Sequence, residues 1–205
     1  MRSEGIIQDK NFFWILNQWN LKTYSMPSYP EILTVETQAV AFTKIYALRK
    51  FTAYNEKRGL VAEADTYWVL MDVKNRKLGT ITDDICKTWN GAISESKIKP
   101  LKLKHQENYE YQYAIKVGNL NIDTLNHVYN VCYVEWALNY ISFKILNEYR
   151  LENMVVSYLK ETYLYEDITV SVKCIEEENG VVKYFHMLSK NDDTVVCLIE
   201  SMWMR

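Results

Sequence analysis

The residue types best suited to chemistry gather in one short turn, Asp123–His127 (DTLNH), which holds a carboxylate, an amide and an imidazole. The turn precedes a stretch from Val128 to Phe143 in which Glu135 is the one charged side chain. A segment that apolar predicts a long helix buried on nearly every face. Unpaired N–H groups and the helix dipole favour negative charge at the start of such a helix. The turn is therefore a candidate site for acid–base chemistry.

The same turn also has a purely structural interpretation. Asp and Asn are preferred helix-capping residues, so Asp123 and Asn126 could serve only to begin the helix. A lone His127 would more often be a hydrogen-bonded structural residue. Cys132 could be taken for a nucleophile, but no basic partner lies beside it in the sequence. A buried, inert thiol is the simpler interpretation of Cys132.

Composition and charge argue against several classes of protein. A net charge of −2 gives no electrostatic footprint for nucleic acid. No apolar run approaches the roughly 20 residues of a membrane span, and the N-terminus lacks the shape of a signal peptide. Four widely spaced cysteines and three histidines make a zinc site unexpected. Free thiols indicate a reducing, cytoplasmic location, and we expect no metal or cofactor.

Strand patterns dominate the 205 residues, a length that suits one large domain or two small ones. The chain up to residue 75 predicts an almost unbroken antiparallel meander. The polar, lysine-containing stretch 91–106 predicts an interdomain linker, and the helix follows a further strand. The expected strands lie at 11–23, 32–41, 43–54, 61–73, 108–117, 153–162, 167–176, 181–189 and 194–204.

The two halves of the chain align with each other. The segment Tyr29–Val35 (YPEILTV) matches Tyr165–Val170 (YEDITV). Farther on, Ala62–Trp68 (AEADTYW) matches Cys197–Trp203 (CLIESMW) in length and in its last residue. The separation of the two segments is the same in both halves to within one residue. The sequence therefore predicts one structural unit built twice.

The second copy begins with a strand and a helix, 108–146, whereas only about a dozen residues precede the first strand of the first copy. The first copy is thus expected to lack its own helix, which would expose an apolar sheet face. Another chain could cover that face, as in a homodimer, or the two halves could share one helix. The interpretation that we favour is truncation at the N-terminus.

The segment Asp123–Trp136 resembles the active-site segment of hot-dog thioesterases. It is most similar to that of the acyl-acyl carrier protein thioesterases, which carry two hot-dog repeats in one chain. The first half resembles the same family in order and approximate spacing. Its matching residues are Trp14–Leu16 (WIL), Tyr29–Pro30, Thr34–Thr37 (TVET), Arg49, Phe51, Trp68, Asp72 and Arg76.

The resemblance implies an α+β fold of tandem hot-dog repeats, with antiparallel sheets wrapping a long central helix. Residues 1–90 would form the first, incomplete repeat, 91–106 the linker, and 107–205 the second repeat with the active-site segment. The implied activity is hydrolysis of acyl-acyl carrier protein to free fatty acid and carrier protein in fatty acid biosynthesis.

The family's second repeat carries the pattern Asp-x-Asn-x-His before the helix and a Glu on the next strand. Asp123 and His127 match the first and last positions, and Glu161 falls where the family has its strand Glu. The sequence departs from the pattern at Leu125, where the family has Asn. The neighbouring Asn126 could supply the missing amide.

The resemblance assigns roles to these residues. Asp123 would act as base or nucleophile, and His127 would orient water or relay a proton. Glu161 would orient His127 or the water. Backbone N–H groups of Asn130 and Val131 would bind the developing oxyanion. Other hot-dog enzymes use a helix carboxylate, but Glu135 is expected one turn too far along the helix.

The implied partner is an acyl carrier protein bearing a fatty acyl thioester. Such an acidic protein would dock on the basic linker, at Lys97, Lys99, Lys102 and Lys104, although a solvated linker is the simpler explanation of those lysines. Leu125 keeps two alternatives open, an acyl-CoA thioesterase and a catalytically weak acyl-binding fragment.

Overall fold

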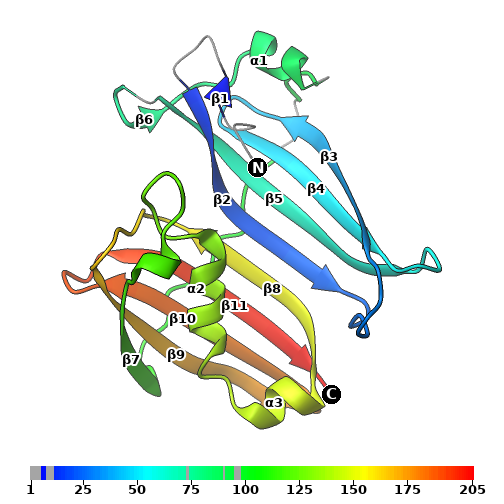
Figure 1. Cartoon of the computed structure of the whole chain (residues 1–205), viewed down its shortest axis with the longest axis vertical. Helices are drawn as coiled ribbons and strands as arrows, with labels where there is room; N and C mark the ends of the chain where they lie inside the picture. The colour runs from blue at the N-terminus through cyan, green and yellow to red at the C-terminus, as the bar shows by residue number, and fades with distance from the viewer. Residues whose placement is uncertain (1–5, 8–11, 73, 90, 95–97) are drawn as a thin grey trace. The chain divides into compact units, whose positions relative to one another are not determined.

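The computed structural model describes residues 6–7, 12–72, 74–89, 91–94 and 98–205. Contacts within the chain divide it into two compact units, 1–101 and 102–205. Each unit is built on an antiparallel sheet (Figure 1). The expected antiparallel strands are present, but the meander is incomplete: the strand expected at 11–23 pairs with the one at 61–73 and not with its chain neighbour at 32–41. The predicted limits of the linker, 91–106, are not tested by this division.

The first unit has four long strands in the spatial order β3-β4-β5-β2, and two short strands extend β2 and β5. Its helix α1 packs Ile85 and Cys86 against Phe42 and Leu70 in a buried apolar cluster. The elements are β1 (Ile6–Ile7), β2 (Phe12–Thr23), β3 (Thr34–Phe42), β4 (Tyr46–Tyr54), β5 (Leu60–Asp72), β6 (Lys77–Leu78) and α1 (Asp83–Thr88).

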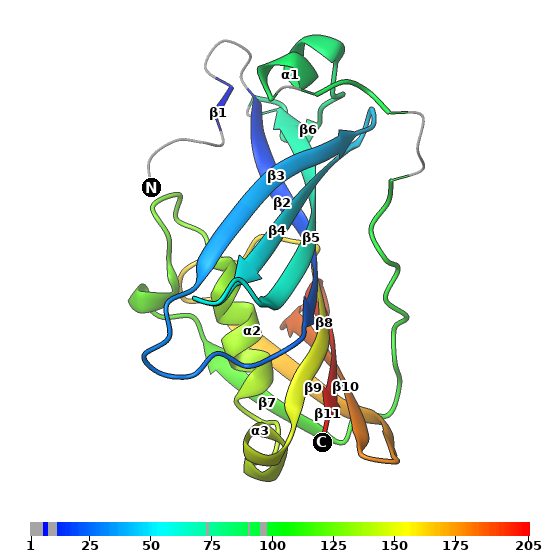
Figure 2. The ribbon, with the colours of Figure 1, turned by 90° about the vertical axis from the view of Figure 1, so that its right-hand side faces the viewer.

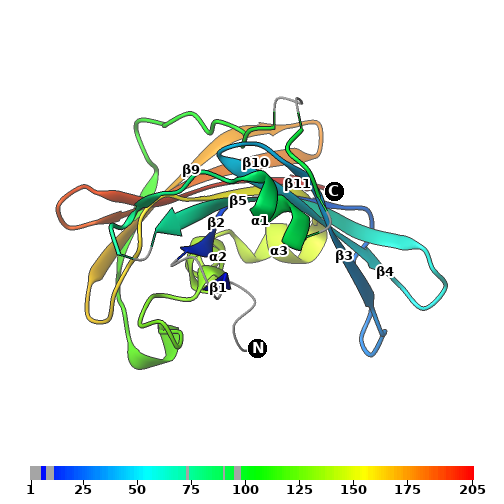
Figure 3. The same cartoon turned by 90° about the horizontal axis from the view of Figure 1, so that it is seen from above.

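The second unit has five strands in the order β8-β11-β10-β9-β7. Helix α2 packs on β9, β10 and β11, and α2 and α3 lie on the same side of this sheet in two views (Figures 2 and 3). The elements are β7 (Tyr111–Lys116), a 3-10 turn (Asn119–Asn121), α2 (Asn130–Leu138), α3 (Phe143–Glu148), β8 (Arg150–Tyr158), β9 (Asp167–Glu178), β10 (Val181–Lys190) and β11 (Val195–Met204).

The internal repeat is confirmed by the order of the strands. The first unit runs β3-β4-β5-β2 and the second runs β9-β10-β11-β8, which is the same order of corresponding strands. A shared local bond supports the match. The indole of Trp68 donates to the Thr66 hydroxyl at 2.8 Å, and that of Trp203 donates to the Ser201 hydroxyl at 3.0 Å.

The prediction of one long helix is wrong, because α2 spans nine residues and ends at Leu138. A turn follows, and Ser142 caps the separate helix α3, its hydroxyl accepting from the N–H of Ile145 at 3.3 Å. Short polar side chains compete for backbone hydrogen bonds and so favour helix ends. Burial on nearly every face is also wrong: α2 buries one stripe against the sheet, and Val131 is 57% exposed.

The predicted linker is bonded to the first unit at several points. Gln18 is 1% exposed, and its amide both donates to the carbonyl and accepts from the N–H of Leu101, each at 2.8 Å. Ile93 pairs with Phe42 in an isolated parallel bridge. Of the four lysines, Lys97 lies outside the described residues, and the other three are exposed.

Strand β10 carries a buried histidine, His186, which is 0% exposed. Neither ring nitrogen has a hydrogen-bond partner, and the residues opposite in the sheet are Val172 and Ile199. Burial without a partner disfavours the charged ring, which lowers the pKa of His186 to about 4. The imidazole is therefore neutral in the folded protein at pH 7.

This histidine predicts a loss of stability in mild acid. The unfolded chain binds a proton below its ordinary pKa of about 6.5 and the folded chain does not, so the free energy of unfolding falls between pH 6.5 and about 4. The limiting slope is about 1.4 kcal/mol per pH unit. Urea unfolding of wild type and His186→Phe across this pH range measures the slope. His186→Phe should lose the slope. The control variant His105→Gln, at an exposed histidine, should keep it. Equal slopes in wild type and His186→Phe would contradict the prediction.

Candidate active site

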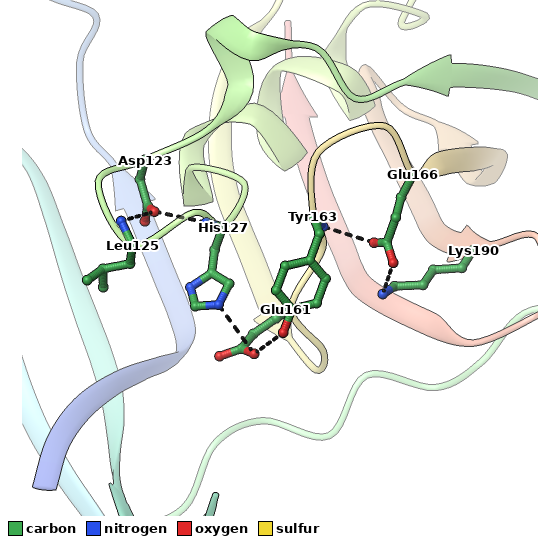
Figure 4. Close-up of polar contacts among 7 residues, drawn as sticks. All are labelled: Asp123, Leu125, His127, Glu161, Tyr163, Glu166 and Lys190. Carbon is green, nitrogen blue, oxygen red and sulfur yellow. Dashed lines mark hydrogen bonds and ion pairs between the residues drawn. The ribbon is translucent and has the colours of Figure 1, made fainter. Parts of the chain in front are cut away.

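The turn before α2 is shaped by the Asp123 carboxylate. Its Oδ1 accepts from the backbone N–H of Leu125 at 2.8 Å and from that of His127 at 3.0 Å (Figure 4). Asn126 has a positive φ of 64° and donates its N–H to the Asp123 carbonyl at 3.1 Å. Asp readily bonds backbone N–H groups ahead of it, and Asn tolerates the left-handed conformation. The residue types of the turn thus fix its local shape.

Capping of α2 by Asp123 or Asn126 is not what the structure shows. The residue that precedes the helix is Tyr129, which makes no side-chain cap. The carboxylate of Asp123 organises the turn instead of the helix end. The first two N–H groups of α2 belong to Asn130 and Val131. They have no carbonyl partner within the helix, because the residues that would accept them lie before its start. Both residues are exposed.

A backbone hydrogen bond joins this turn to a second loop. The N–H of Val128 donates to the Thr162 carbonyl at 2.9 Å. Glu161 was expected on a strand, but β8 ends at Tyr158 and Glu161 lies in the loop that follows. The chain leaves the ladder there because the N–H groups of Leu159 and Lys160 both turn to the Val196 carbonyl, at 2.9 and 3.2 Å.

The two loops bring His127 and Glu161 together. Nε2 of the imidazole lies 3.5 Å from Oε2 of the carboxylate, and the two side chains are 24% and 31% exposed. The other ring nitrogen, Nδ1, points away from Glu161 (Figure 4). A carboxylate facing Nε2 favours the tautomer that carries its proton there, which leaves Nδ1 as the basic atom. Such a pair can bind water and accept its proton.

The sequence reasoning missed Tyr163. Its hydroxyl donates to Oε2 of Glu161 at 2.7 Å, and its ring lies edge-on to the His127 ring at 5.2 Å between centroids. Its N–H donates to Glu166 at 2.9 Å, and Glu166 also binds Lys190 at 2.8 Å. A tyrosine in an irregular loop carries no periodic signal, so its role becomes visible only in three dimensions.

The other residues considered in the sequence lie in surroundings that do not suit catalysis. Cys132 is buried on the sheet-facing stripe of α2, where burial raises the pKa of its thiol. A thiol held protonated is a poor nucleophile, in keeping with the inert interpretation. Glu135 is on the exposed side of α2. Leu125 is 64% exposed, and its side chain has no hydrogen-bonding group.

Comparison with known proteins agrees with this arrangement of two units. The model of the acyl-ACP thioesterase N-terminal domain matches residues 1–89, and that of the C-terminal domain matches residues 102–205. The chain belongs to the acyl-ACP thioesterase family. The second family domain begins where the second compact unit begins, so the turn, the pair and α2 all lie in the C-terminal domain.

The individual relatives that this chain matches have low sequence identity to it. Oleoyl-acyl carrier protein thioesterase 2 of Arabidopsis thaliana is 23% identical over 184 residues, covering 84% of this chain and 50% of the relative. The palmitoyl-acyl carrier protein thioesterase of Gossypium hirsutum is 22% identical and covers 95% and 50%. The chain thus spans about half the length of the curated relatives it matches.

A solved structure shows the same fold. A putative oleoyl thioesterase from Lactobacillus plantarum superposes with a TM-score of 0.85 at 19% identity, covering 95% of this chain and 77% of that one. The hot-dog fold expected from the sequence is therefore confirmed, with a large antiparallel sheet and few helices. No helix in the described ranges is long and apolar enough to cross a membrane.

Removing the Asp123 carboxylate should loosen the turn. In Asp123→Ala, two backbone N–H groups lose their acceptor, so the free energy of unfolding should fall by about 1–3 kcal/mol. Asp123→Asn keeps an oxygen in the same place and should lose less than about 1 kcal/mol. Chemical unfolding of the three proteins measures both values. Equal losses in the two variants would show that the two hydrogen bonds do not hold the turn.

Proposed function

We propose that this chain hydrolyses acyl-acyl carrier protein, releasing a fatty acid and the carrier protein. Family membership and the names of its relatives support the reaction class. The observation that carries the proposal is the His127–Glu161 pair at 3.5 Å beside the start of α2. A base next to unpaired helix N–H groups supplies the two things that thioester hydrolysis needs, an activated water and an oxyanion site.

In the proposed mechanism, Nδ1 of His127 takes a proton from water as the water oxygen attacks the thioester carbonyl. The charge on the carbonyl oxygen is bound by the N–H groups of Asn130 and Val131, with the Asn126 amide as a further donor. The carbon–sulfur bond then breaks, and the imidazolium returns its proton to the thiolate. Glu161 stabilises the charged imidazole between these steps.

Asp123 has two possible parts in this scheme. As a base or nucleophile it would use an oxygen that faces the substrate. Its Oδ1 is already engaged by two backbone N–H groups, which supports a part in placing His127. We therefore propose Glu161 as the carboxylate that acts on the imidazole and Asp123 as the one that positions it.

Neutral replacements of the pair should abolish most of the turnover. His127→Gln and Glu161→Gln should each lower kcat about 10²–10⁴-fold, the usual contribution of a positioned acid–base group. KM should change little because the acyl chain and carrier contacts remain. Steady-state release of thiol from acyl-carrier protein measures both constants. Wild-type kcat in both variants would refute the proposed site.

The proposed carrier docking rests on the exposed lysines Lys99, Lys102 and Lys104. The triple variant Lys99→Glu, Lys102→Glu, Lys104→Glu should raise KM for the carrier-linked substrate about tenfold at low salt, through lost electrostatic steering. A thioester of the same acyl group on pantetheine, which lacks the acidic protein, should keep its KM. The matched control reverses the exposed lysines Lys57, Lys74 and Lys77, with the same change in net charge. An unchanged KM for the carrier-linked substrate would contradict the docking.

Leu125 favours a second candidate function. It is exposed in the turn and offers no amide where the family pattern has Asn, so the chain could be an acyl-binding module of weak catalysis. The acyl-CoA thioesterase alternative concerns the thiol carrier. Measuring kcat/KM for one acyl group on carrier protein and on coenzyme A separates the three functions. A high value on carrier protein indicates the acyl-carrier protein thioesterase, and a high value on coenzyme A indicates the acyl-CoA thioesterase. Low values on both indicate the acyl-binding module.

Three sequence-based expectations remain proposals. They are a cytoplasmic location, a homodimer, and a first repeat without a hot-dog helix. In the described part of the first unit, α1 is six residues long and follows β5 and β6 in the chain instead of preceding β2, which supports the last of them. The plant relatives are named as chloroplastic, and that location is theirs.

A further inference from the structure

The residue pair proposed for catalysis is linked to a wider set of polar groups on the same loop. Oε2 of Glu161, the oxygen nearest His127, is also the oxygen that accepts the Tyr163 hydroxyl at 2.7 Å. A carboxylate can rotate about its side-chain torsions, whereas a phenol held at both ends cannot. The Tyr163 hydroxyl therefore restricts Glu161 to the orientation in which it faces the imidazole.

Tyr163 is itself held from two sides. Its backbone N–H donates to Oε2 of Glu166 at 2.9 Å, and Oε1 of Glu166 binds Nζ of Lys190 at 2.8 Å. The same ammonium lies 5.4 Å from the centroid of the Tyr163 ring, within the range of a cation–π contact. Figure 4 shows the series His127, Glu161, Tyr163, Glu166 and Lys190 in this order.

The loop that carries these groups is bonded to the residue that follows β7. The N–H of Tyr165 donates to the Val117 carbonyl at 3.1 Å, and the N–H of Val117 donates to the Glu166 carbonyl at 3.0 Å. Lys190 is the last residue of β10, and its side chain is 20% exposed. A partly buried ammonium between a carboxylate and a ring is more restrained than a surface lysine.

We propose that Tyr163 is a positioning residue that sets the orientation of Glu161, and through it the tautomer of His127, with Glu166 and Lys190 holding the tyrosine in place. The inference rests on the proposed function and adds a residue to it. Tyr163 does not touch the reacting atoms. It acts by keeping the carboxylate opposite Nε2, so that Nδ1 stays unprotonated and available to the water.

The test compares Tyr163→Phe with wild type in two measurements. In the first, kcat for acyl-carrier protein should fall about tenfold and KM should stay within about twofold, as expected when one hydrogen bond to a charged group is lost. In the second, ¹⁵N NMR of the imidazole reports the tautomer without any turnover. With three histidines in the chain, His127→Gln identifies the signal. The variant should shift from the Nε2-protonated form towards a mixture of tautomers.

The first unit offers a matched control. Tyr24 donates its hydroxyl to Glu63 at 2.6 Å, and Tyr24 and Tyr163 are each 39% exposed. Tyr24→Phe removes the same kind of bond and should leave kcat and the His127 signal unchanged. Lys190→Met should lower kcat by a smaller factor, and the double variant with Tyr163→Phe should be no slower than Tyr163→Phe alone, because both act through one bond.

The outcomes separate this inference from the proposed function. Wild-type kcat and an unchanged His127 signal in Tyr163→Phe, with Glu161→Gln inactive, would overturn the inference and leave the function standing. Wild-type rates in His127→Gln and Glu161→Gln would overturn the function. In that case the NMR measurement still decides whether Tyr163 sets the tautomer: a shift supports that part, and an unchanged signal refutes it.

Discussion

The site depends on one set of backbone hydrogen bonds between two loops. Asp123 gathers the N–H groups of its own turn, and the N–H of Val128 then reaches the Thr162 carbonyl at 2.9 Å. These bonds fix the positions of His127 and Glu161 relative to each other. Without them the imidazole and the carboxylate would belong to separate, mobile loops, and bringing the two together would cost conformational entropy.

The two units share one architecture, but the candidate site lies in the second unit. Corresponding strands have the same order, and both units repeat the bond from a tryptophan indole to a hydroxyl two residues earlier. In the second unit α2 lies across this sheet, and its N-terminus meets the polar turn. The N- and C-terminal domain models of the family match one unit each, and the candidate site belongs to the second copy.

The polar groups around the pair form a connected series, His127, Glu161, Tyr163, Glu166 and Lys190. In the proposed mechanism His127 exchanges a proton, Glu161 stabilises its charge, and Tyr163 keeps Glu161 in position. Glu166 and Lys190 then hold Tyr163. Active sites need such support because a carboxylate or imidazole turned by a single rotamer step loses its partner. The 3.5 Å separation within the pair is long for a hydrogen bond, and catalytic contacts often tighten when substrate binds.

The sequence by itself determined the strands, the repeat and the polar turn. These follow from alternation along each strand and from bonds spanning a few residues, such as those of Asp123. Only the tertiary structure decided that α2 buries one stripe against the sheet and that Glu161 lies in a loop. It alone placed Tyr163 beside Glu161 and His127. The physical reason is that the end of β8, fixed by its bonds to β11, sets where that loop meets the turn, and no local pattern encodes such a contact.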